Sequence, residues 1–286
     1  MAVSLSGAIL RAAWDTRLDD ELVGRIDQIH ARYAGRDGDP FGFEPQDLRY
    51  VAPVIQALYR RYFRVQASGL EHLPEGRVLL IANHSGQVPI DATMIGAACL
   101  LEADPPRVPR AMVERWVPTL PVVSSFFARM GQVLGTPANC RRMLRDEEAV
   151  LVFPEGVRGI NKPYAKRYQL QQFGHGFMRL ALENDTPIVP VGVVGAEEQY
   201  PVLWNLEGVA KRIGMPALPI SPLMVAGPLA AIPLPTKYRI YFGHPLRFHG
   251  DPDDDERVIG GYVGQVRDAI DSLLQRGLAE RRGWFA

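Results

Sequence analysis

Residues 79–91 read LLIANHSGQVPID, and this stretch decides how the chain folds. The aliphatic run at its start is typical of a strand that is buried on both faces. That run ends on Asn83, His84 and Ser85, and a helix that carries Asp91 in its first turn is expected to follow. In open α/β sheets, ligands bind at the carboxyl ends of the strands. We therefore expect a strand that delivers polar side chains to a ligand-binding edge of a sheet.

Segments typical of strands and helices alternate on both sides of this stretch. A second aliphatic run, AVLVFPEG at 149–156, also ends on polar residues, and TPIVPVGVV at 186–194 resembles another strand. Amphipathic periodicity predicts helices over 16–34 and 45–65. Strands that are separated by helices favour parallel pairing. We expect an α/β fold with a central, largely parallel sheet flanked by helices and preceded by an N-terminal helical segment.

We expect the chain to consist of a helical membrane-docking segment at 1–64 and an α/β domain at 65–286. Two segments are candidates for contact with a membrane. An apolar stripe over 51–65 alternates with arginines, which predicts either a helix packed on the core or a helix that lies on lipid phosphates. The proline-rich stretch 201–236 disfavours helix and central strand, and predicts either a covering loop or a surface for acyl chains or a bilayer. The apolar residues proposed for that surface are Trp204, Leu206, Ile213, Leu218 and Leu223.

Composition limits the classes of function. The chain has 286 residues, of which 47% are hydrophobic and 22% charged, as in a globular protein with a large core. The formal net charge of +0 gives no overall attraction to nucleic acid, so we expect no such partner. No apolar run reaches the roughly 18 residues that a membrane span requires, and we expect peripheral association instead. The two cysteines, Cys99 and Cys140, are expected to be free thiols in a reducing compartment.

The candidate chemistry lies at two strand ends, because the sequence carries no GxSxG, P-loop, GxGxxG, HExxH or CxxC motif. A histidine that is hydrogen-bonded to a carboxylate can act as a general base, and the first strand end offers His84 with Asp91. At the second, Gly156 permits close approach and Arg158 presents a planar set of donors to an anion, beside Glu155. The histidines form no metal-binding pattern, so we expect no metal ion.

Three motifs resemble, in order, the sequence blocks of the glycerolipid acyltransferases, the group that contains the lysophosphatidic acid acyltransferases. They are NHSGQVPID at 83–91, VLVFPEGVRG at 150–159 and TPIVPVGVVG at 186–195, and the resemblance covers about residues 65–200. It implies transfer of a fatty acyl group from acyl-CoA or acyl carrier protein to a hydroxyl of a glycerolipid or lysophospholipid. It also implies no metal, no other cofactor and no covalent acyl-enzyme, on the cytoplasmic face of a membrane.

The resemblance also implies roles for individual residues. His84 would be the general base and Asp91 the residue that orients it. Candidate substrate-binding residues are Asn83, Ser85, Glu155, Gly156 and Arg158. The family separates its histidine and aspartate by four residues, whereas six intervene here, and a longer loop could still return Asp91 to His84.

Two basic residues of the family pattern are missing, from GQVLGTP at 131–137 and from Phe-Gly-His-Gly at 173–176. Arg141 and Lys162, and also Lys166 and Arg167, are candidates to replace that charge. Without it, a neutral acceptor such as monoacylglycerol or diacylglycerol is favoured over a phosphomonoester, because an unpaired dianion in a partly dry site is costly. A third alternative is a non-catalytic peripheral lipid-binding protein on the same scaffold.

Overall fold

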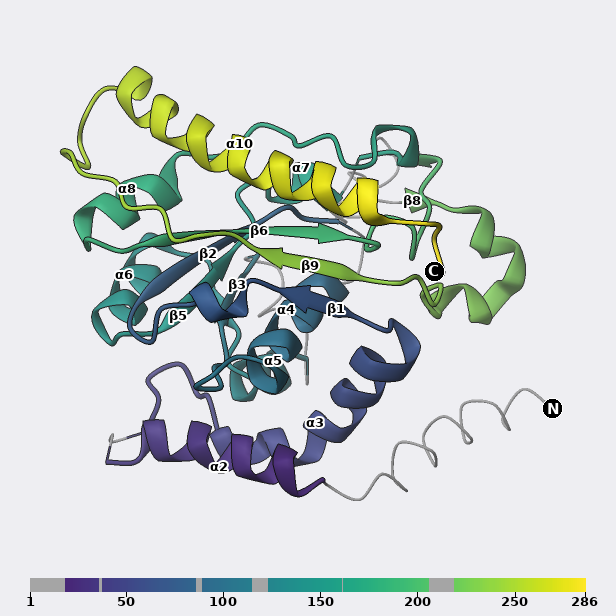
Figure 1. Cartoon of the computed structure of the whole chain (residues 1–286), viewed down its shortest axis with the longest axis horizontal. Helices are drawn as coiled ribbons and strands as arrows, with labels where there is room; N and C mark the ends of the chain where they lie inside the picture. Colours follow the sequence, from purple (N-terminus) through teal and green to yellow (C-terminus); the bar gives the residue numbers. More distant parts are fainter. Residues whose placement is uncertain (1–18, 36–37, 86–88, 115–122, 161, 206–218) are drawn as a thin grey trace.

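The structure is a computed structural model that describes residues 19–35, 38–85, 89–114, 123–160, 162–205 and 219–286. Its centre is a seven-stranded sheet with the strand order β1-β9-β6-β2-β5-β3-β4. Each neighbouring pair is parallel except β6 with β9, which is antiparallel. The prediction of a largely parallel sheet flanked by helices is confirmed (Figure 1).

The strands and helices that the sequence predicted are present in the predicted order, together with further elements. The strands of the sheet are β1 (Gln66–Ser68), β2 (Val78–Ala82), β3 (Arg110–Val113), β4 (Val133–Leu134), β5 (Ala149–Val152), β6 (Ile188–Val194) and β9 (Arg239–Phe242), and a separate hairpin contains β7 (Trp204–Asn205) and β8 (Pro219–Ile220). The α-helices are α2 (Asp20–Tyr33), α3 (Leu48–Ala57), α4 (Ile90–Leu101), α5 (Val123–Arg129), α6 (Pro137–Arg145), α7 (Val157–Ile160), α8 (Gly176–Glu183) and α10 (Glu256–Glu280). Short turns of other helix types are η1 (Pro45–Asp47), η2 (Leu58–Tyr62), η3 (Leu70–His72), η5 (Tyr164–Lys166) and η6 (Pro222–Ala231).

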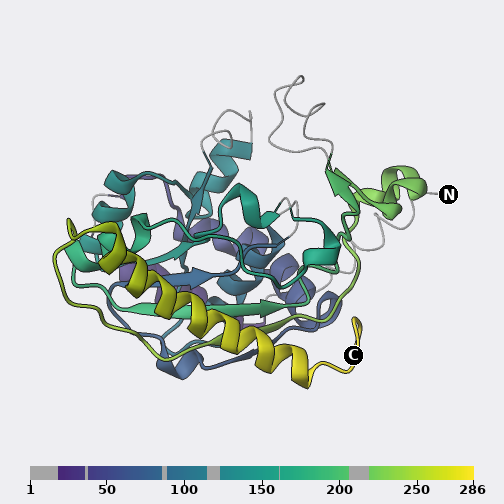
Figure 2. The same cartoon turned by 90° about the horizontal axis from the view of Figure 1, so that it is seen from above.

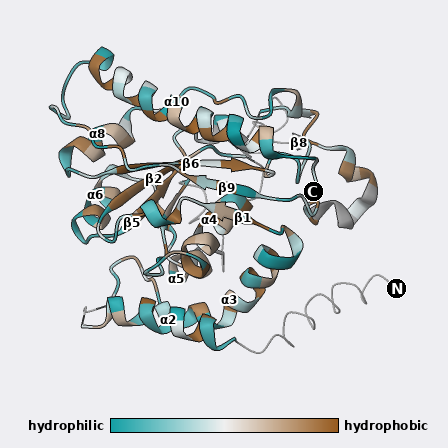
Figure 3. Cartoon of the chain, viewed as in Figure 1, coloured by the Kyte–Doolittle hydropathy of each residue, from teal (hydrophilic) through white to brown (hydrophobic). Residues whose placement is uncertain are grey.

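The sheet lies between two layers of helices, with α10 over one face and α2, α3 and α4 below the other (Figures 1 and 2). All five residues of β2 are buried. Because side chains alternate along a strand, Val78 and Leu80 join the hydrophobic cluster that includes α2, α3 and α4, whereas Leu79 and Ile81 join the cluster with α6, α8 and α10. Two-sided burial is the physical reason for the unbroken aliphatic run, and Figure 3 shows the apolar strands at the centre of the molecule.

The N-terminal helical segment shares a core with the sheet. Tyr59 and Phe63 are each 1% exposed and lie in the cluster that contains residues of β2, β6 and β9. Of the stripe that the sequence predicted, Ile55, Leu58 and Tyr62 are partly buried against this cluster, which favours packing on the core, whereas Val54 is 38% exposed. Among the described elements, no helix has both the length and the apolar composition needed to cross a bilayer.

The proline-rich stretch contains more regular structure than the sequence predicted. The β7–β8 hairpin and the ten-residue η6 lie within 201–236, where a loop was one interpretation. Neither element conflicts with proline, because the two strands are only two residues long and η6 begins at Pro222. The predicted absence of a central strand from this stretch is confirmed for its described part. Of the proposed apolar residues, Leu206, Ile213 and Leu218 lie outside the described ranges.

Candidate active site

His84 and Asp91 meet at the carboxyl end of β2. The imidazole Nδ1 and the Asp91 Oδ2 lie 2.7 Å apart, so the six-residue separation does bring the carboxylate back to the histidine. Asp91 is fully buried in the first turn of α4, and its oxygens also accept hydrogen bonds from the N–H groups of Ser85 at 3.0 Å and Ala92 at 2.8 Å. The Asp91 carboxylate is thus held in place by hydrogen bonds with the His84 ring and with two backbone N–H groups.

The pairing with Asp91 determines which imidazole nitrogen can accept a proton. Because a carboxylate accepts hydrogen bonds, Nδ1 of His84 carries the hydrogen and Nε2 presents its lone pair. Within the part of the chain that the structure describes, Nε2 has no hydrogen-bond partner, and the side chain is 15% exposed. The ring stacks on Phe153, with centroids 4.1 Å apart and planes at 23°. The histidine is therefore held in one orientation and open to a substrate.

Glu155 fixes the loop that carries His84. One of its carboxylate oxygens accepts a 3.0 Å hydrogen bond from the backbone N–H of His84, and the other accepts a 2.8 Å bond from the N–H of Gln171. The residue is only 3% exposed. Glu155 was predicted from the sequence as a substrate-binding residue. Both of its carboxylate oxygens instead accept hydrogen bonds from the protein backbone, so it holds the loop of His84 in place.

Two glycines allow the segment after β5 to approach His84. Gly156 has φ +54°, a left-handed conformation that favours glycine. A Cβ atom added to Gly159 would lie 3.0 Å from the Cβ of Glu155, 3.1 Å from the Cβ of His84 and 3.2 Å from the His84 carbonyl oxygen. Gly159 therefore allows the close approach of the two strand ends, because any side chain there would require the neighbouring atoms to shift by a few tenths of an ångström.

Arg158 provides a cation between these two glycines. It lies on α7, it is exposed, and its guanidinium donates a 3.1 Å hydrogen bond to Gln172 Oε1. No described carboxylate forms an ion pair with it, so most of its five N–H donors are available to an anion. Of the residues predicted at this strand end, Arg158 is the one that the structure leaves open to a ligand.

Asn83 and Ser85 flank the histidine but differ in availability. The Asn83 amide is fully buried and pairs twice with the backbone of Val193, donating to its carbonyl at 3.1 Å and accepting from its N–H at 2.8 Å. The structure therefore does not leave Asn83 free for a substrate, because both ends of its amide join β2 to β6. The buried hydroxyl of Ser85 has no partner among the described residues and stays a candidate substrate contact.

Two of the four candidate replacement cations, Lys162 and Arg141, are paired with carboxylates, whereas the other two are exposed. Lys162 has a side chain only 4% exposed, and its Nζ lies 2.8 Å from Glu197 Oε1 and 3.9 Å from Glu155 Oε2. Burial raises the pKa of Glu197 to about 7, although Lys162 acts to lower it. Arg141 forms a 2.6 Å ion pair with Glu183. Glu183 is the last residue of α8 and precedes β6, so the pair lies near the amino ends of the strands, away from His84. The structure thus brings Lys162 beside the site with its charge matched, and does not bring Arg141 to it.

Four residues that build the site, namely Phe153, Gly159, Gln171 and Glu197, were not predicted from the sequence. Phe153 and Gly159 lie inside the quoted motif at 150–159, so their positions carried a signal. Gln171 contributes only a backbone N–H, and no sequence pattern reveals such a contact. Glu197 comes three residues after the last residue of β6, and an acid close to the end of a buried strand was a signal that could have been used.

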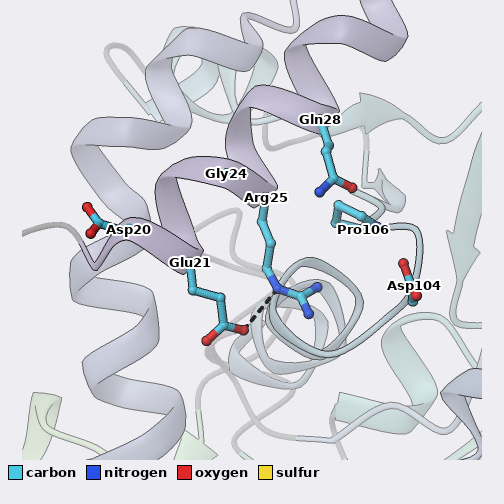
Figure 4. A pocket seen from close by; sticks show the side chains of 7 residues that line it. All are labelled: Asp20, Glu21, Gly24, Arg25, Gln28, Asp104 and Pro106. Atoms are coloured by element: carbon cyan, nitrogen blue, oxygen red, sulfur yellow. Dashed lines mark hydrogen bonds and ion pairs between the residues drawn. The ribbon is translucent and has the colours of Figure 1, made fainter.

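A hollow of about 300 Å³ lies elsewhere, between α2 and the segment after α4 (Figure 4). Its lining residues are Asp20, Glu21, Gly24, Arg25, Gln28, Asp104 and Pro106. Arg25 forms an ion pair there with Glu21 at 3.3 Å and donates a hydrogen bond to the carbonyl of Ala103 at 2.9 Å. Asp91 lies in the first turn of α4, whereas Asp104 lies just beyond its end. The 12 residues of α4 span about 18 Å, so the two aspartates are far apart. The hollow is therefore distinct from the His84 site.

Comparison with known proteins places this geometry in context. The model of the family described as Acyltransferase matches residues 64–194. An uncharacterized protein of Mycobacterium tuberculosis is 37% identical over 254 residues, which is 86% of this chain and 71% of the relative. A chicken (Gallus gallus) protein named "DGAT1/2-independent enzyme synthesizing storage lipids" is 24% identical over 211 residues, covering 73% of this chain and 58% of the relative.

Among solved structures, the 1-acyl-sn-glycerophosphate (LPA) acyltransferase PlsC from Thermotoga maritima superposes with a TM-score of 0.51. The alignment covers 90% of this chain and 88% of that one at 15% sequence identity, a likeness that concerns the fold. The family match ends at β6, so it contains both strand ends that meet at His84.

Proposed function

We propose that this chain, which belongs to the acyltransferase family, transfers a fatty acyl group from a thioester donor to a hydroxyl of a glycerolipid or lysophospholipid. The donor is acyl-CoA or acylated acyl carrier protein, which present the same thioester chemistry. The reaction needs no metal and no further cofactor. The observation that carries the proposal is the 2.7 Å contact that fixes His84 with Nε2 open at the end of β2.

In the proposed reaction, Nε2 of His84 accepts the proton of the acceptor hydroxyl while the oxygen attacks the thioester carbonyl carbon. Asp91 stabilises the imidazolium that forms. The tetrahedral adduct then collapses, its carbon–sulfur bond breaks, and the imidazolium returns the proton to the leaving thiolate. The products are an ester and a thiol, and His84 is neutral again. No acyl group is attached to the protein at any step.

The acceptor belongs to one of two classes. A lysophospholipid such as a 1-acylglycerol-3-phosphate is supported by Arg158, whose donors suit a phosphate. A neutral acceptor, monoacylglycerol or diacylglycerol, is supported by the pairing of Lys162 with Glu197 and of Arg141 with Glu183, which leaves neither cation for a dianion. The storage-lipid activity in the name of the chicken relative agrees with the second class, and the name of the Thermotoga maritima enzyme with the first.

The non-catalytic alternative is less well supported. A lipid-binding protein without catalytic activity would not require the buried Asp91 and the Glu155 carboxylate, which together hold the imidazole of His84 in one orientation. We also propose that the chain works as a peripheral protein on the cytoplasmic face of a membrane, where its acceptor is embedded in lipid and its donor is in solution.

The proposal is tested with radiolabelled oleoyl-CoA, oleoyl acyl carrier protein and liposomes that contain lysophosphatidic acid, other lysophospholipids, monoacylglycerol or diacylglycerol. We expect one labelled lipid ester whose formation falls at least about 100-fold in His84→Ala, because general-base catalysis contributes that much or more. A folded His84→Ala protein with wild-type turnover, or no ester with either donor, would overturn it.

Arg158→Gln then separates the two acceptor classes. If the acceptor carries a phosphate, this variant raises the KM for the acceptor, because it removes a charged donor set. If the acceptor is neutral, the KM stays close to that of the wild type. The same assay therefore identifies both the product and the group that Arg158 contacts.

A further inference from the structure

An uncharged arm extends from the edge of the sheet at which His84 lies. We define the arm as the described residues 202–205 and 219–236, which contain the β7–β8 hairpin and η6. The arm connects β6 to β9, and these strands are antiparallel with Val194 paired to Arg239. It therefore leaves and re-enters the sheet at the carboxyl end of β6, and β2 runs parallel to β6. Figures 1 and 2 both show the arm projecting beyond the sheet.

The arm exposes several large apolar side chains. The exposed residues are Leu203, Trp204, Met224, Val225 and Ile232, with Val225 at 95% and Trp204 at 66%. Single exposed apolar residues are ordinary, but a gathering of them on one projection is typical of a contact surface. The sequence from 213 to 236 contains no charged residue, which is unusual for a solvated surface in a chain that is 22% charged.

The C-terminal residues continue this surface at the base of the arm. The backbone N–H of Lys237 donates a 2.8 Å hydrogen bond to the carbonyl of Trp284, and the exposed rings of Trp284 and Phe285 lie 6.4 Å apart. Arg64 donates to the carbonyl of Pro235 at 2.7 Å and to that of Phe285 at 3.3 Å. The arm and the aromatic tail are thus fixed to one another.

Cations border the apolar surface. Arg167 is exposed and lies 4.7 Å above the ring of Tyr164, which in turn makes an edge contact with Trp284 at 5.7 Å. Lys237, which is partly exposed, directly follows the uncharged run in the sequence. Apolar and aromatic side chains bordered by lysine and arginine match the interface of a bilayer with anionic lipid, where rings lie at headgroup level and cations meet phosphates.

We infer that the arm, together with Trp284 and Phe285, is the surface with which this protein binds an anionic lipid bilayer, and that this contact turns the His84 edge toward the lipid. The inference deepens the proposed function, because it states how the site reaches an acceptor embedded in a membrane. It assigns the contact to the arm in place of α3, whose apolar stripe packs largely on the core.

Flotation of the full-length protein with vesicles tests the inference without any catalysis. The vesicles are phosphatidylcholine alone and phosphatidylcholine mixed with phosphatidylglycerol. The arm variant carries Met224→Asp and Val225→Asp, and the matched control carries Tyr50→Asp and Val54→Asp, which replace exposed apolar residues of α3. We expect the wild type and the control to float with the mixed vesicles, and the arm variant to bind at least about tenfold more weakly.

The outcomes are distinct from those of the activity assay. Flotation of the arm variant equal to that of the wild type, or no flotation of the wild type, overturns the inference. So does self-association of the wild type that the arm substitutions abolish, because the arm would then be a protein interface. Thermal unfolding of the arm variant should match the wild type, since the substituted side chains lie outside the core.

A second readout links docking to turnover. With an acceptor of short acyl chain that is soluble in water, the arm variant should react at the wild-type rate, and with the same acceptor class in vesicles it should be at least about tenfold slower. Equal loss with both acceptors would overturn the assignment of the arm to lipid contact. If the wild type acylates no acceptor in either form, the proposed function fails, and flotation still decides the docking surface.

Discussion

The carboxylate of Glu155 accepts a 3.0 Å hydrogen bond from the backbone N–H of His84, so the strand end after β5 holds the strand end after β2 in place. The two residues are 71 positions apart in the chain. Glu155, which was expected to face a substrate, is therefore a buried structural residue. Of the charged residues in the motif at 150–159, Arg158 is the one that stays open to a ligand. The residues that hold the histidine in place are thus separate from the residues that can touch a substrate.

Replacement of Glu155 should destabilise the protein and lower turnover. Glu155→Gln leaves a single acceptor oxygen for two N–H donors, and its NH2 group would face one of them. We expect a loss of about 1–3 kcal/mol in the free energy of unfolding and a lower kcat. Arg158→Gln is the matched control, because its exposed side chain should leave stability unchanged. Urea unfolding of both variants checks this, and equal stability of Glu155→Gln and wild type would contradict it.

Asp91→Asn should abolish most of the activity while the fold persists. An asparagine can present its NH2 group to Nδ1 of His84, which stabilises the wrong tautomer and leaves Nε2 without its lone pair. We expect kcat to fall about 100- to 10,000-fold, measured as thiol release from the donor with acceptor present. His175→Ala serves as the control histidine, because His175 pairs with Glu256 at the surface and should not be needed for turnover. Near-normal rates in Asp91→Asn would remove Asp91 from the proposed mechanism.

Gly159→Ala should impair the site for purely steric reasons. The added methyl group would lie 3.0–3.2 Å from atoms of Glu155 and His84, so the two strand ends would have to separate. We expect kcat to fall at least about tenfold, because small displacements of a catalytic group are costly. Gly176→Ala is the control, since a Cβ there has nothing within 4 Å. Activity that is equal in the two alanine variants would show that the gap between the strand ends is not required.

The stability of the protein should carry a pH dependence from Glu197. Burial raises the pKa of its carboxyl from the ordinary 4.5 to about 7, so between these values the folded chain keeps a proton that the unfolded chain has lost. Stability from this group is therefore present below pH 4.5 and lost as the pH rises to about 7, by at most about 3 kcal/mol.

Glu197→Gln removes that dependence, because glutamine does not titrate. The free energy of unfolding of the variant, relative to the wild type, should therefore improve as the pH is raised from 4.5 to about 7. Urea unfolding at several pH values measures the difference, and Glu183→Gln at the surface controls for the loss of a carboxylate. Parallel pH profiles for Glu197→Gln and wild type would contradict this, because they would mean that the pKa of Glu197 is the same in the folded and the unfolded chain.

The sequence by itself determined the order of the strands and helices, because hydrophobic periodicity is a property of neighbouring residues. The unbroken aliphatic run at 78–82 indicated a strand covered on both faces, and the structure has it. The pairing of His84 with Asp91 could also be predicted, since both residues lie in one strand–loop–helix unit that returns the second to the first.

Only the tertiary structure decided which polar residues face inward. The amide of Asn83 is used by Val193, 110 positions away, and the charge of Lys162 is matched by Glu197, so neither is free although the sequence suggested both as ligand-binding residues. The tertiary structure also decided that most of the stripe at 51–65 packs on the core while the arm at 202–205 and 219–236 exposes large apolar side chains. The physical reason is that burial and hydrogen-bond satisfaction depend on contacts between distant segments, whereas a sequence pattern reports only which side chains could make them.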